Sequence, residues 1–236
     1  MAESPSNQLL ASLPAPDLDL LLPQLRFVDL PQETILFEAG DTISRIFFPH
    51  SGIVSLVVEL GSGEMIEAAM IGREGVVGGL AALDSNVSVS QAIMQVAGAA
   101  SAVDVDVVRR LAEQSNGFRT ILIKHEQLLL AQSQQSAACN ATHTLEARLS
   151  RWLLRCRDLI GGDDIALTQE FVAQMLGVRR TSVSIVANTL QQAGFIKYKR
   201  GQIRLLDVDG LRESACECYG AVKAVSDRLI GPPSGT

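Results

Sequence analysis

The sequence has few aromatic residues and no long apolar run. Aromatic residues make up 4 % of its 236 positions, whereas 47 % are hydrophobic, so a core has to be built from Leu, Val, Ile and Ala. No stretch of roughly eighteen apolar residues is free of charged or strongly polar groups, which argues against a membrane span. The segment 1–8 is acidic and polar and lacks the basic and apolar parts of a secretory signal. We therefore expect a cytoplasmic protein.

Cysteine is also scarce, with four residues, Cys139, Cys156, Cys216 and Cys218, in the second half of the chain. They are too few and too scattered for a disulfide framework. Cys216 and Cys218 lie one residue apart and cannot complete a metal site alone, because Cys139, Cys156 or a histidine would have to approach them. We expect packed or exposed thiols and no cofactor; a metal or redox role is the less favoured alternative.

Catalytic patterns are missing as well. The three histidines, His50, His125 and His143, are dispersed, and neither a Ser/His/Asp arrangement nor a metalloprotease spacing is visible. We expect no enzyme activity.

The net charge of −6 is distributed unevenly along the chain. Residues 1–144 carry 7 Lys/Arg against 16 Asp/Glu, residues 145–206 carry 10 against 5, and residues 207–236 carry 3 against 5. An acidic front part followed by a basic segment indicates two domains with different roles. The basic segment is where a polyanion would bind.

The front part has the pattern of a small antiparallel β-structure. Short runs rich in Val and Ile alternate with glycine-containing turns, which favours the strands of a sandwich or roll. These runs cover residues 34–37, 45–48, 53–60, 65–71, 90–96 and 100–105. Residues 1–23 contain four prolines and predict a loose tail with one or two helical turns. The fold class is therefore α+β.

Helical periodicity follows the strands. A short helix is predicted over 107–114 and a long one over 118–138, without Pro or Gly. An apolar stripe on the long helix is equally compatible with core packing inside the chain and with a dimer seam. Polar residues that continue the stripe suit a subunit interface. The seam residues would be Phe118, Ile121, Leu122, His125, Leu128, Leu129 and Gln132. A further helix is predicted over 142–160, with Thr142 or Thr144 as N-cap.

The segment 167–190 has the pattern of a helix-turn-helix. Thr168 is a suitable N-cap for the first helix, Ala173 is small enough for a second helix to cross closely, and Gly177 suits a tight left-handed turn. The second helix begins near Arg179. In such a motif the start of the second helix enters the major groove of DNA.

A basic hairpin follows the motif. Two short apolar runs flank the turn at Lys199, Arg200 and Gly201, which predicts a β-hairpin wing. From 168 to 206 there are six Lys/Arg and one acidic residue, as phosphate neutralisation requires. The predicted DNA-contacting residues are Thr168, Gln169, Arg179, Arg180, Thr181, Ser182, Ser184, Ile185, Asn188, Lys199 and Arg200.

With this motif in place, residues 20–212 resemble the cyclic-AMP receptor and fumarate–nitrate regulator (Crp/Fnr) family. The segment 167–206 carries the most specific part of the resemblance, and Gly40, Gly52, Gly72 and Gly78 fall where the β-roll of that family turns. The resemblance implies a homodimer that binds a near-palindromic DNA site and contacts RNA polymerase. Some members hold an iron–sulfur cluster on N-terminal cysteines; this chain has no cysteine before Cys139, so we expect no such cluster.

The family's cyclic-AMP pocket is altered. Members that bind cyclic AMP use a Glu for the ribose and an Arg for the phosphate, and Gly79 and Ser90 stand at these positions here. A buried phosphate without its arginine would be uncompensated, so we expect no cyclic-AMP binding in the usual mode unless a neighbour such as Arg73 substitutes. The degenerate pocket would comprise Gly78, Gly79, Leu80, Ser90, Gln91, Ala92, Gln134 and Gln135.

The recognition helix is altered too. Where members often carry Ser-Arg-Glu-Thr-Val-x-Arg, Arg180 keeps the first arginine, while Thr181 and Ile185 replace the Glu and the last Arg. Arg180 can pair with guanine, but the Glu-to-cytosine contact is lost, so the operator should differ. Arg179 is expected to contact a phosphate.

We therefore expect a dimeric DNA-binding transcription regulator of bacterial type. The alternative is a sensory or scaffold protein that keeps the winged helix for protein interaction. The expected organisation is a flexible tail (1–20), a cyclic-nucleotide-binding-like β-roll (21–115), a dimerisation helix (116–140), a winged helix-turn-helix domain (141–220) and a C-terminal tail (221–236).

Overall fold

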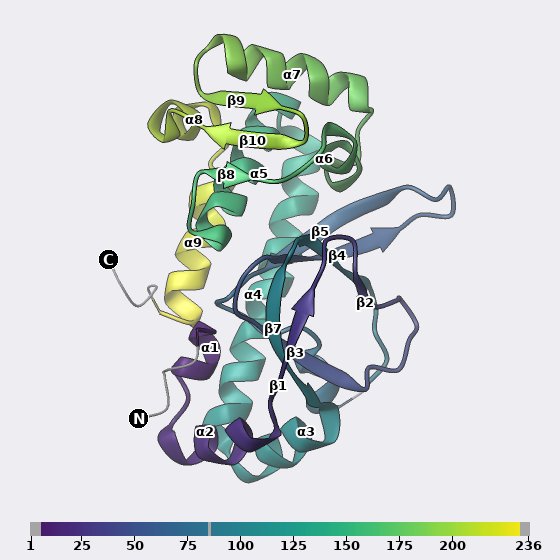
Figure 1. Ribbon diagram of the computed structural model, residues 1–236, viewed down its shortest axis with the longest axis vertical. Coiled ribbons are helices and arrows are strands. Elements are labelled where there is room, and N and C mark those ends of the chain that lie inside the picture. Colours follow the sequence, from purple (N-terminus) through teal and green to yellow (C-terminus); the bar gives the residue numbers. More distant parts are fainter. Residues whose placement is uncertain (1–5, 85, 232–236) are drawn as a thin grey trace.

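The computed structural model describes residues 6–84 and 86–231. It contains an N-terminal part and a C-terminal part joined by a long helix (Figure 1). The first part holds two antiparallel sheets, with strand orders β1-β7-β3 and β2-β6-β4-β5. Their strands are β1 Arg26–Leu30, β2 Ile35–Phe37, β3 Arg45–Pro49, β4 Ile53–Glu59, β5 Met65–Ile71, β6 Gln91–Val96 and β7 Gly98–Asp104. The predicted α+β class and the antiparallel roll are confirmed. Strand β1 was not predicted, because Arg26 and Asp29 interrupt its apolar pattern.

The start of the described chain contains the helical turns that the sequence predicts, but residues 6–20 pack on the β-roll and are not a loose tail; residues 1–5 lie outside the described part. Three short helices are present: α1 Gln8–Ala11, α2 Ala15–Leu21 and the 3-10 turn η1 Leu22–Gln24. The Asn7 side chain caps α1 and donates to the carbonyls of Pro49 and Gly75 at 2.8 and 2.9 Å. Leu9, Leu10 and Leu21 are buried in the β-roll core.

Helices α3 Val105–Gln114 and α4 Asn116–Thr142 follow the roll, and the Ser115 hydroxyl caps α4 by accepting from the Phe118 N–H. Much of the predicted dimer stripe packs into the chain's own β-roll. His125 accepts from the Val76 N–H at 3.3 Å, and Gln132 accepts from the Met70 N–H at 3.2 Å. Six of the seven stripe residues are buried and the seventh is partly buried, so the seam prediction is wrong for this stripe: Phe118, Ile121, Leu122, His125, Leu128, Leu129 and Gln132.

A different stripe of α4 stays on the surface. Its members lie three or four residues apart and repeat every seven residues, which is the spacing of a coiled-coil seam. Among them Ile123 is 40 % exposed and Leu130 is 59 % exposed. The exposed stripe comprises Thr120, Ile123, Gln127, Leu130, Gln134, Ala137 and Ala141.

The C-terminal part is a winged helix-turn-helix with two helices, α8 and α9, more than predicted. Its elements are α5 Leu145–Ile160, β8 Asp164–Ile165, α6 Gln169–Leu176, α7 Arg180–Gln192, β9 Ile196–Lys199, β10 Gln202–Leu205, α8 Val208–Ser214 and α9 Cys218–Leu229. Thr144, not Thr142, caps α5. Residues 221–229 belong to helix α9, which packs beside α4, and therefore are not a tail. Residues 232–236 lie outside the described part.

The two parts contact each other directly. The turn of the helix-turn-helix lies against the β4–β5 hairpin, where a Cβ at Gly177 would come 3.0 Å from the Ile66 side chain. Below this contact, a cavity of about 520 Å³ opens between β5, α4, α5 and α9. Glu67, Arg73, Arg151 and Arg155 are among the side chains that line it. In the described part of the chain, no helix is both long and apolar enough to cross a membrane.

Candidate nucleic-acid interface

The helix-turn-helix is built as its sequence predicts. The Thr168 hydroxyl caps α6 by accepting from the Phe171 N–H at 3.1 Å. Gly177 ends α6 with φ +62°, a left-handed conformation that glycine adopts without strain. Ala173 is buried where α7 crosses α6, and Val183 and Leu190 bury the inner face of α7. The two helices therefore hold the start of α7 at a defined angle to the rest of the domain.

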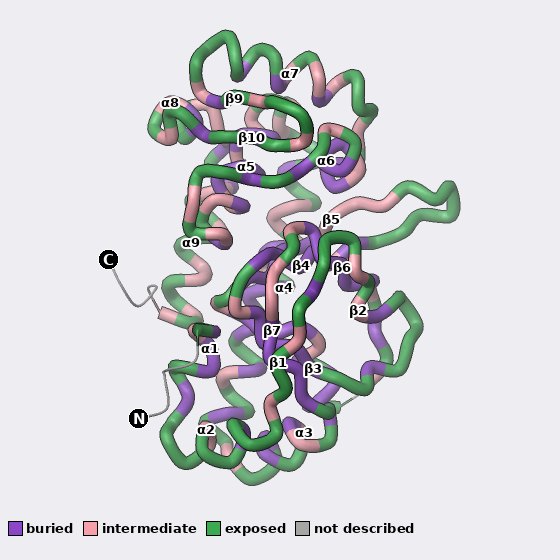
Figure 2. Tube along the Cα trace, in the orientation of Figure 1, coloured by how far each residue is buried: buried purple, intermediate pink, exposed green. Residues whose placement is uncertain are grey.

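The outer face of α7 is free for a ligand, and Figure 2 shows it largely exposed at one end of the molecule. Thr181 and Asn188 are exposed, and Ile185 is 69 % exposed although it is apolar. Ser182 is partly buried. An exposed Ile in the middle of a polar helix face can contact the methyl group of a thymine.

Two predicted DNA contacts instead bond to each other. The Ser184 hydroxyl donates to the Gln169 side-chain oxygen at 2.6 Å, and this contact ties α7 to α6. The Gln169 backbone N–H donates to the Tyr198 hydroxyl at 3.0 Å. Tyr198 was not predicted as part of the site. The sequence feature that could have indicated it is its position between Lys197 and Lys199 in the basic hairpin.

The arginines at the start of α7 are exposed. Arg179 occupies the N-cap position without a side-chain cap bond. The Arg180 side chain is 65 % exposed and its Nε lies 3.7 Å from the Glu170 carboxylate. Such a surface pair contributes little to stability, so Arg180 can be released to another partner at small cost.

The predicted wing is present. Gln202 pairs with Lys199 across a two-residue turn, in which Arg200 has φ +48° and Gly201 has φ +78°. Two positive φ values are typical of the tight turn that matches the twist of a hairpin. Lys199 and Arg200 are exposed at its tip, whereas Arg204 forms a two-pronged pair with Asp164 that raises the pKa of Arg204 and lowers that of Asp164.

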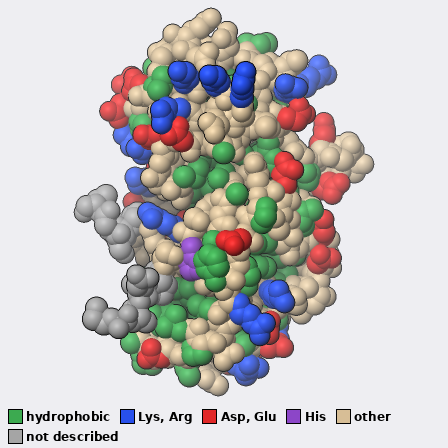
Figure 3. Space-filling view, in the orientation of Figure 1, with side chains coloured by type: hydrophobic (Ala, Val, Ile, Leu, Met, Phe, Trp, Pro, Cys, Tyr) green, Lys and Arg blue, Asp and Glu red, His purple; other side chains and the backbone are tan. Residues whose placement is uncertain are grey.

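Positive charge collects at this end of the molecule. Figure 3 shows a row of Lys and Arg side chains across the winged end, over β9 and β10. Below it the same face carries mixed charge, with Asp and Glu along the β-hairpin side. The charge distribution therefore places the favourable surface for a polyanion on the same domain as α7.

The residues of the predicted effector pocket differ in how far they are exposed. Gly78 and Gly79 begin the 3-10 turn η2 Gly79–Ala82 beside α4, where a Cβ at Gly79 would lie 3.0 Å from Val76. Among the other members, Leu80 is 47 % exposed, Ser90 is partly buried and Ala92 is fully buried. Ala92 pairs with Phe37, whose ring would lie 3.5 Å from a Cβ at Gly78.

The polar residues of this set face elsewhere. The Gln91 amide donates to the Glu38 carboxylate, so the charged group beside β6 is negative. Gln134 is exposed, and Gln135 donates to the Cys218 sulfur at 3.0 Å, so the prediction that these two glutamines face the β-roll is wrong. Arg73 lines the interdomain cavity near Gly161, away from β6.

A partly buried acid links the two domains. The Glu67 carboxylate on β5 accepts from the Trp152 indole N–H at 2.9 Å and from the Ser55 hydroxyl at 2.7 Å. Burial raises the pKa of Glu67 to about 7, while the two hydrogen bonds and the nearby Arg151 and Arg155 oppose the shift. The protonation state of the domain contact therefore changes near neutral pH.

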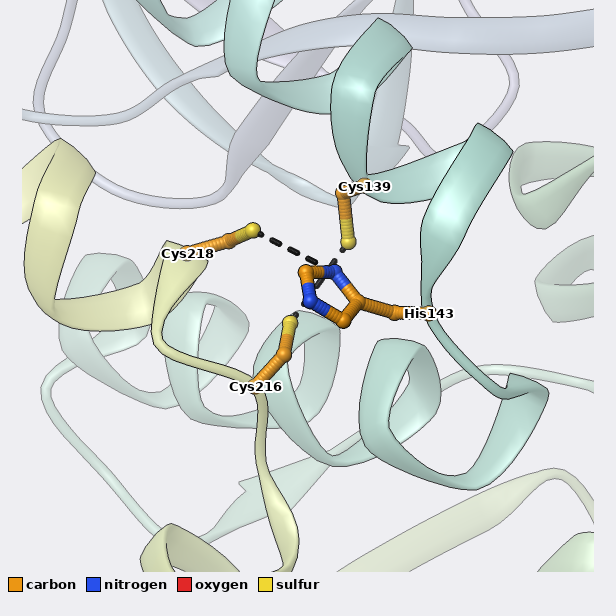
Figure 4. Close-up of side chains that lie close together, drawn as sticks. All are labelled: Cys139, His143, Cys216 and Cys218. Atoms are coloured by element: carbon orange, nitrogen blue, oxygen red, sulfur yellow. Dashed lines mark hydrogen bonds between the residues drawn. The ribbon is translucent and has the colours of Figure 1, made fainter.

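Three cysteines and a histidine lie together where α4 meets the start of α9. The ligand atoms of Cys139, His143, Cys216 and Cys218 all lie within 4.8 Å of one another. Figure 4 shows the four side chains pointing toward a common centre, two from α4 and its end and two from the segment before and at the start of α9. Cys139 and His143 thus meet the condition that the sequence set for a metal site at the Cys216–Cys218 pair, whereas Cys156 lies elsewhere, hydrogen-bonded to Gln95.

Comparisons with known proteins agree with this architecture. Residues 27–115 match the profile of the cyclic nucleotide-binding domain, and residues 147–214 match the Crp-like helix-turn-helix domain. No curated protein sequence matches the chain.

Several solved structures share the fold at low identity. FixK2 from Bradyrhizobium japonicum is 17 % identical with a TM-score of 0.70, covering 81 % of this chain and 98 % of its own. The c-di-GMP-responsive global regulator CLP from Xanthomonas campestris is 16 % identical with a TM-score of 0.66, covering 81 % and 99 %. A CRP-family transcriptional regulator from Thermus thermophilus is 19 % identical with a TM-score of 0.67, covering 80 % and 96 %. With a β-roll, a long connecting helix and a winged helix-turn-helix in this order, the chain belongs to the Crp/Fnr family.

Proposed function

We propose that the protein is a homodimeric, sequence-specific DNA-binding transcription regulator of the cytoplasm. The observation that carries this proposal is the exposed outer face of α7, with Arg179 and Arg180 at its start and the basic tip of the wing beside it. Arg180 would read a base edge in the major groove, while Arg179, Lys199 and Arg200 would neutralise phosphates. RNA polymerase is the partner that the family membership suggests.

Dimerisation is proposed through the exposed stripe of α4. Ile123 and Leu130 would form the apolar centre of a two-helix seam, and Gln127 and Gln134 would alternate with them. A two-fold axis along α4 would present two copies of α7 to two half-sites, which accounts for a near-palindromic operator.

The β-roll would not take cyclic AMP in the usual mode. Ser90 supplies no positive charge for the phosphate, Glu38 adds a negative one beside Gln91, and Arg73 faces the other side of the roll. The space beside Gly79 is already occupied by Val76 and Glu126. A small anionic ligand would be poorly stabilised there.

An electrophoretic mobility shift on the DNA upstream of the protein's own gene tests the proposal. Specific binding should weaken steeply from about 50 to 200 mM salt, because several phosphate contacts release counterions. Arg200→Ala should make the salt dependence shallower by about one unit of log–log slope, while Arg110→Ala, an exposed arginine on α3, should leave it unchanged.

An absent shift, or one that does not respond to salt, would contradict DNA binding. That result would favour a sensory or scaffold protein in which the winged helix binds another protein.

A further inference from the structure

The cysteine–histidine cluster has the composition of a metal site. The polypeptide supplies two ligands from one helix end, Cys139 and His143, four residues apart and therefore on one face of α4. Cys216 and Cys218 come from the turn before α9 and from its first residue. Three thiols and one imidazole make a complete four-ligand set, as found in closed structural zinc sites.

The size of the cluster fits a single ion. A tetrahedral site with metal–sulfur bonds of about 2.3 Å places neighbouring ligand atoms about 3.8 Å apart. Here the sulfurs of Cys139 and Cys216 are 3.5 Å apart, and the Cys218 sulfur is 3.5 Å from His143 Nδ1. All pairs lie within 4.8 Å, so the four atoms surround one small centre. A cluster of two or four irons would need wider spacing, because its ligands sit on different irons.

The surroundings support the same assignment. His143 presents Nδ1 to the centre and Nε2 to the Glu217 carboxylate at 3.2 Å, which is how a metal-bound histidine is usually oriented. The Gln135 amide donates to the Cys218 sulfur at 3.0 Å, a bond that a thiolate accepts better than a thiol.

Arg148 provides the matching charge. It is only 8 % exposed, and its Nε has no hydrogen-bond partner among the described residues. Burial lowers the pKa of Arg148, and the nearby Cys139 and Cys216 oppose that shift. Three thiolates, a neutral imidazole and a divalent cation carry a net charge of −1, which a buried guanidinium would compensate. Arg148 also donates to the Leu176 carbonyl at the end of α6, so it connects the cluster to the helix-turn-helix.

We propose that Cys139, His143, Cys216 and Cys218 bind one Zn²⁺-type cation that joins α9 to the end of the long helix. On binding, each cysteine sulfur loses its proton to solvent and forms a bond to the ion, without any change of oxidation state. With four protein ligands the site is closed, so its role is structural: it holds α9 against α4 and positions Arg148 beneath the helix-turn-helix. The proposal stands independently of the DNA-binding function.

Metal titration of the full-length protein tests the site. The chain, purified under reducing conditions and stripped with a chelator, is titrated with Co²⁺ and then with Zn²⁺. We expect one Co²⁺ per chain, with the absorption of tetrahedral cobalt and of thiolate-to-cobalt charge transfer, displaced by one Zn²⁺.

Variants separate the site from general folding. Cys218→Ser and His143→Ala should each lose stoichiometric binding, whereas Cys156→Ala, the matched control outside the cluster, should keep it. His143→Cys should restore binding with a stronger charge-transfer band, and Glu217→Ala should weaken affinity about 10-fold to 100-fold. Circular dichroism of each variant confirms that it is folded.

Three outcomes would overturn the proposal. They are a folded, reduced wild-type chain that binds no metal at one equivalent, a Cys139–Cys216 disulfide found as the native state, and acid-labile sulfide that marks an iron–sulfur cluster. Equal loss of binding in the Cys156→Ala control would also count against the four-residue assignment. Because metal content is measured without DNA, these results are distinct from a failure of DNA binding.

Discussion

Substitution of Arg180 tests most directly whether the protein recognises a specific DNA sequence. Its only described ionic partner is Glu170, 3.7 Å away on the neighbouring helix, and both side chains are exposed. We expect Arg180→Ala to weaken binding to the specific site by about 1–3 kcal/mol and to relax selection at one base pair. Binding-site selection from a random library, followed by titration of the selected DNA, measures both effects.

Glu170→Gln is the informative counterpart, because it removes the negative charge that competes for Arg180. It should leave base preference unchanged and should not weaken binding. A uniform loss of affinity over all sequences in Arg180→Ala would instead show that this arginine contacts the DNA backbone.

Glu67 should make stability fall as the pH rises. Its pKa is about 7 in the folded chain against an ordinary value of 4.5. Between these values the folded state keeps a proton that the unfolded state has lost, so protonation favours folding at low pH and this contribution disappears by about pH 7. The loss is at most about 3 kcal/mol, and smaller to the extent that water in the cavity reaches the carboxylate.

Chemical denaturation at pH 5 and pH 8 measures this contribution. Glu67→Gln keeps the hydrogen-bonding shape and should flatten the difference, whereas Glu64→Gln, on the exposed hairpin turn, should behave like the wild type. An unchanged pH dependence in Glu67→Gln would assign the effect to other groups.

At the scale of elements, the long helix α4 has two apolar faces with different partners. Leu130→Glu should convert the proposed dimer to a monomer, because it places a charge in the centre of the seam while leaving the β-roll side of α4 untouched. Sedimentation equilibrium of the variant measures the change. Val89→Glu, an 87 % exposed position on the β-roll, is the control and should remain dimeric. A dimeric Leu130→Glu chain would place the interface elsewhere.

The sequence pattern identified α4 but not which face meets which partner. The stripe through Phe118 and Leu122 is the more apolar one, and both residues are fully buried because the β-roll packs on it. The weaker stripe with Ile123 and Leu130 stays on the surface. Periodicity shows that a face is apolar, but the choice between a domain and a second subunit depends on tertiary packing.

Other elements show the same difference between local features, which the sequence predicts, and features that depend on tertiary packing. The caps, the turn glycine and the wing are local features, and their positions follow from the residues at Thr168, Gly177 and Arg200. The cysteine cluster is not local, because Cys139 and Cys216 are 77 positions apart and meet only where α9 packs on α4. The sequence signs were the closely spaced Cys216–Cys218 pair and the four-residue spacing of Cys139 and His143, which places them on one helix face.

For the whole molecule, the proposed loss of the cyclic-AMP site makes a direct prediction. Isothermal titration calorimetry of the full chain with cyclic AMP should show no binding in the micromolar range, because the phosphate finds no arginine beside Ser90. Ser90→Arg supplies that charge and tests whether the missing side chain alone is responsible. A micromolar dissociation constant for the wild type would contradict the proposed loss of the site.

The contact of Gly177 with Ile66 also bears on how such a regulator is controlled. The β-hairpin touches the turn of the helix-turn-helix and leaves Thr181, Ile185 and Asn188 exposed. In this conformation the surface that reads DNA is therefore already open. In a dimer, control would then act on the separation and tilt of the two helix-turn-helix domains, because their recognition helices must match half-sites about 34 Å apart. In the proposed dimer, the quantity under regulation would be a spacing between subunits, and the hairpin would set it rather than a cover over the recognition helix.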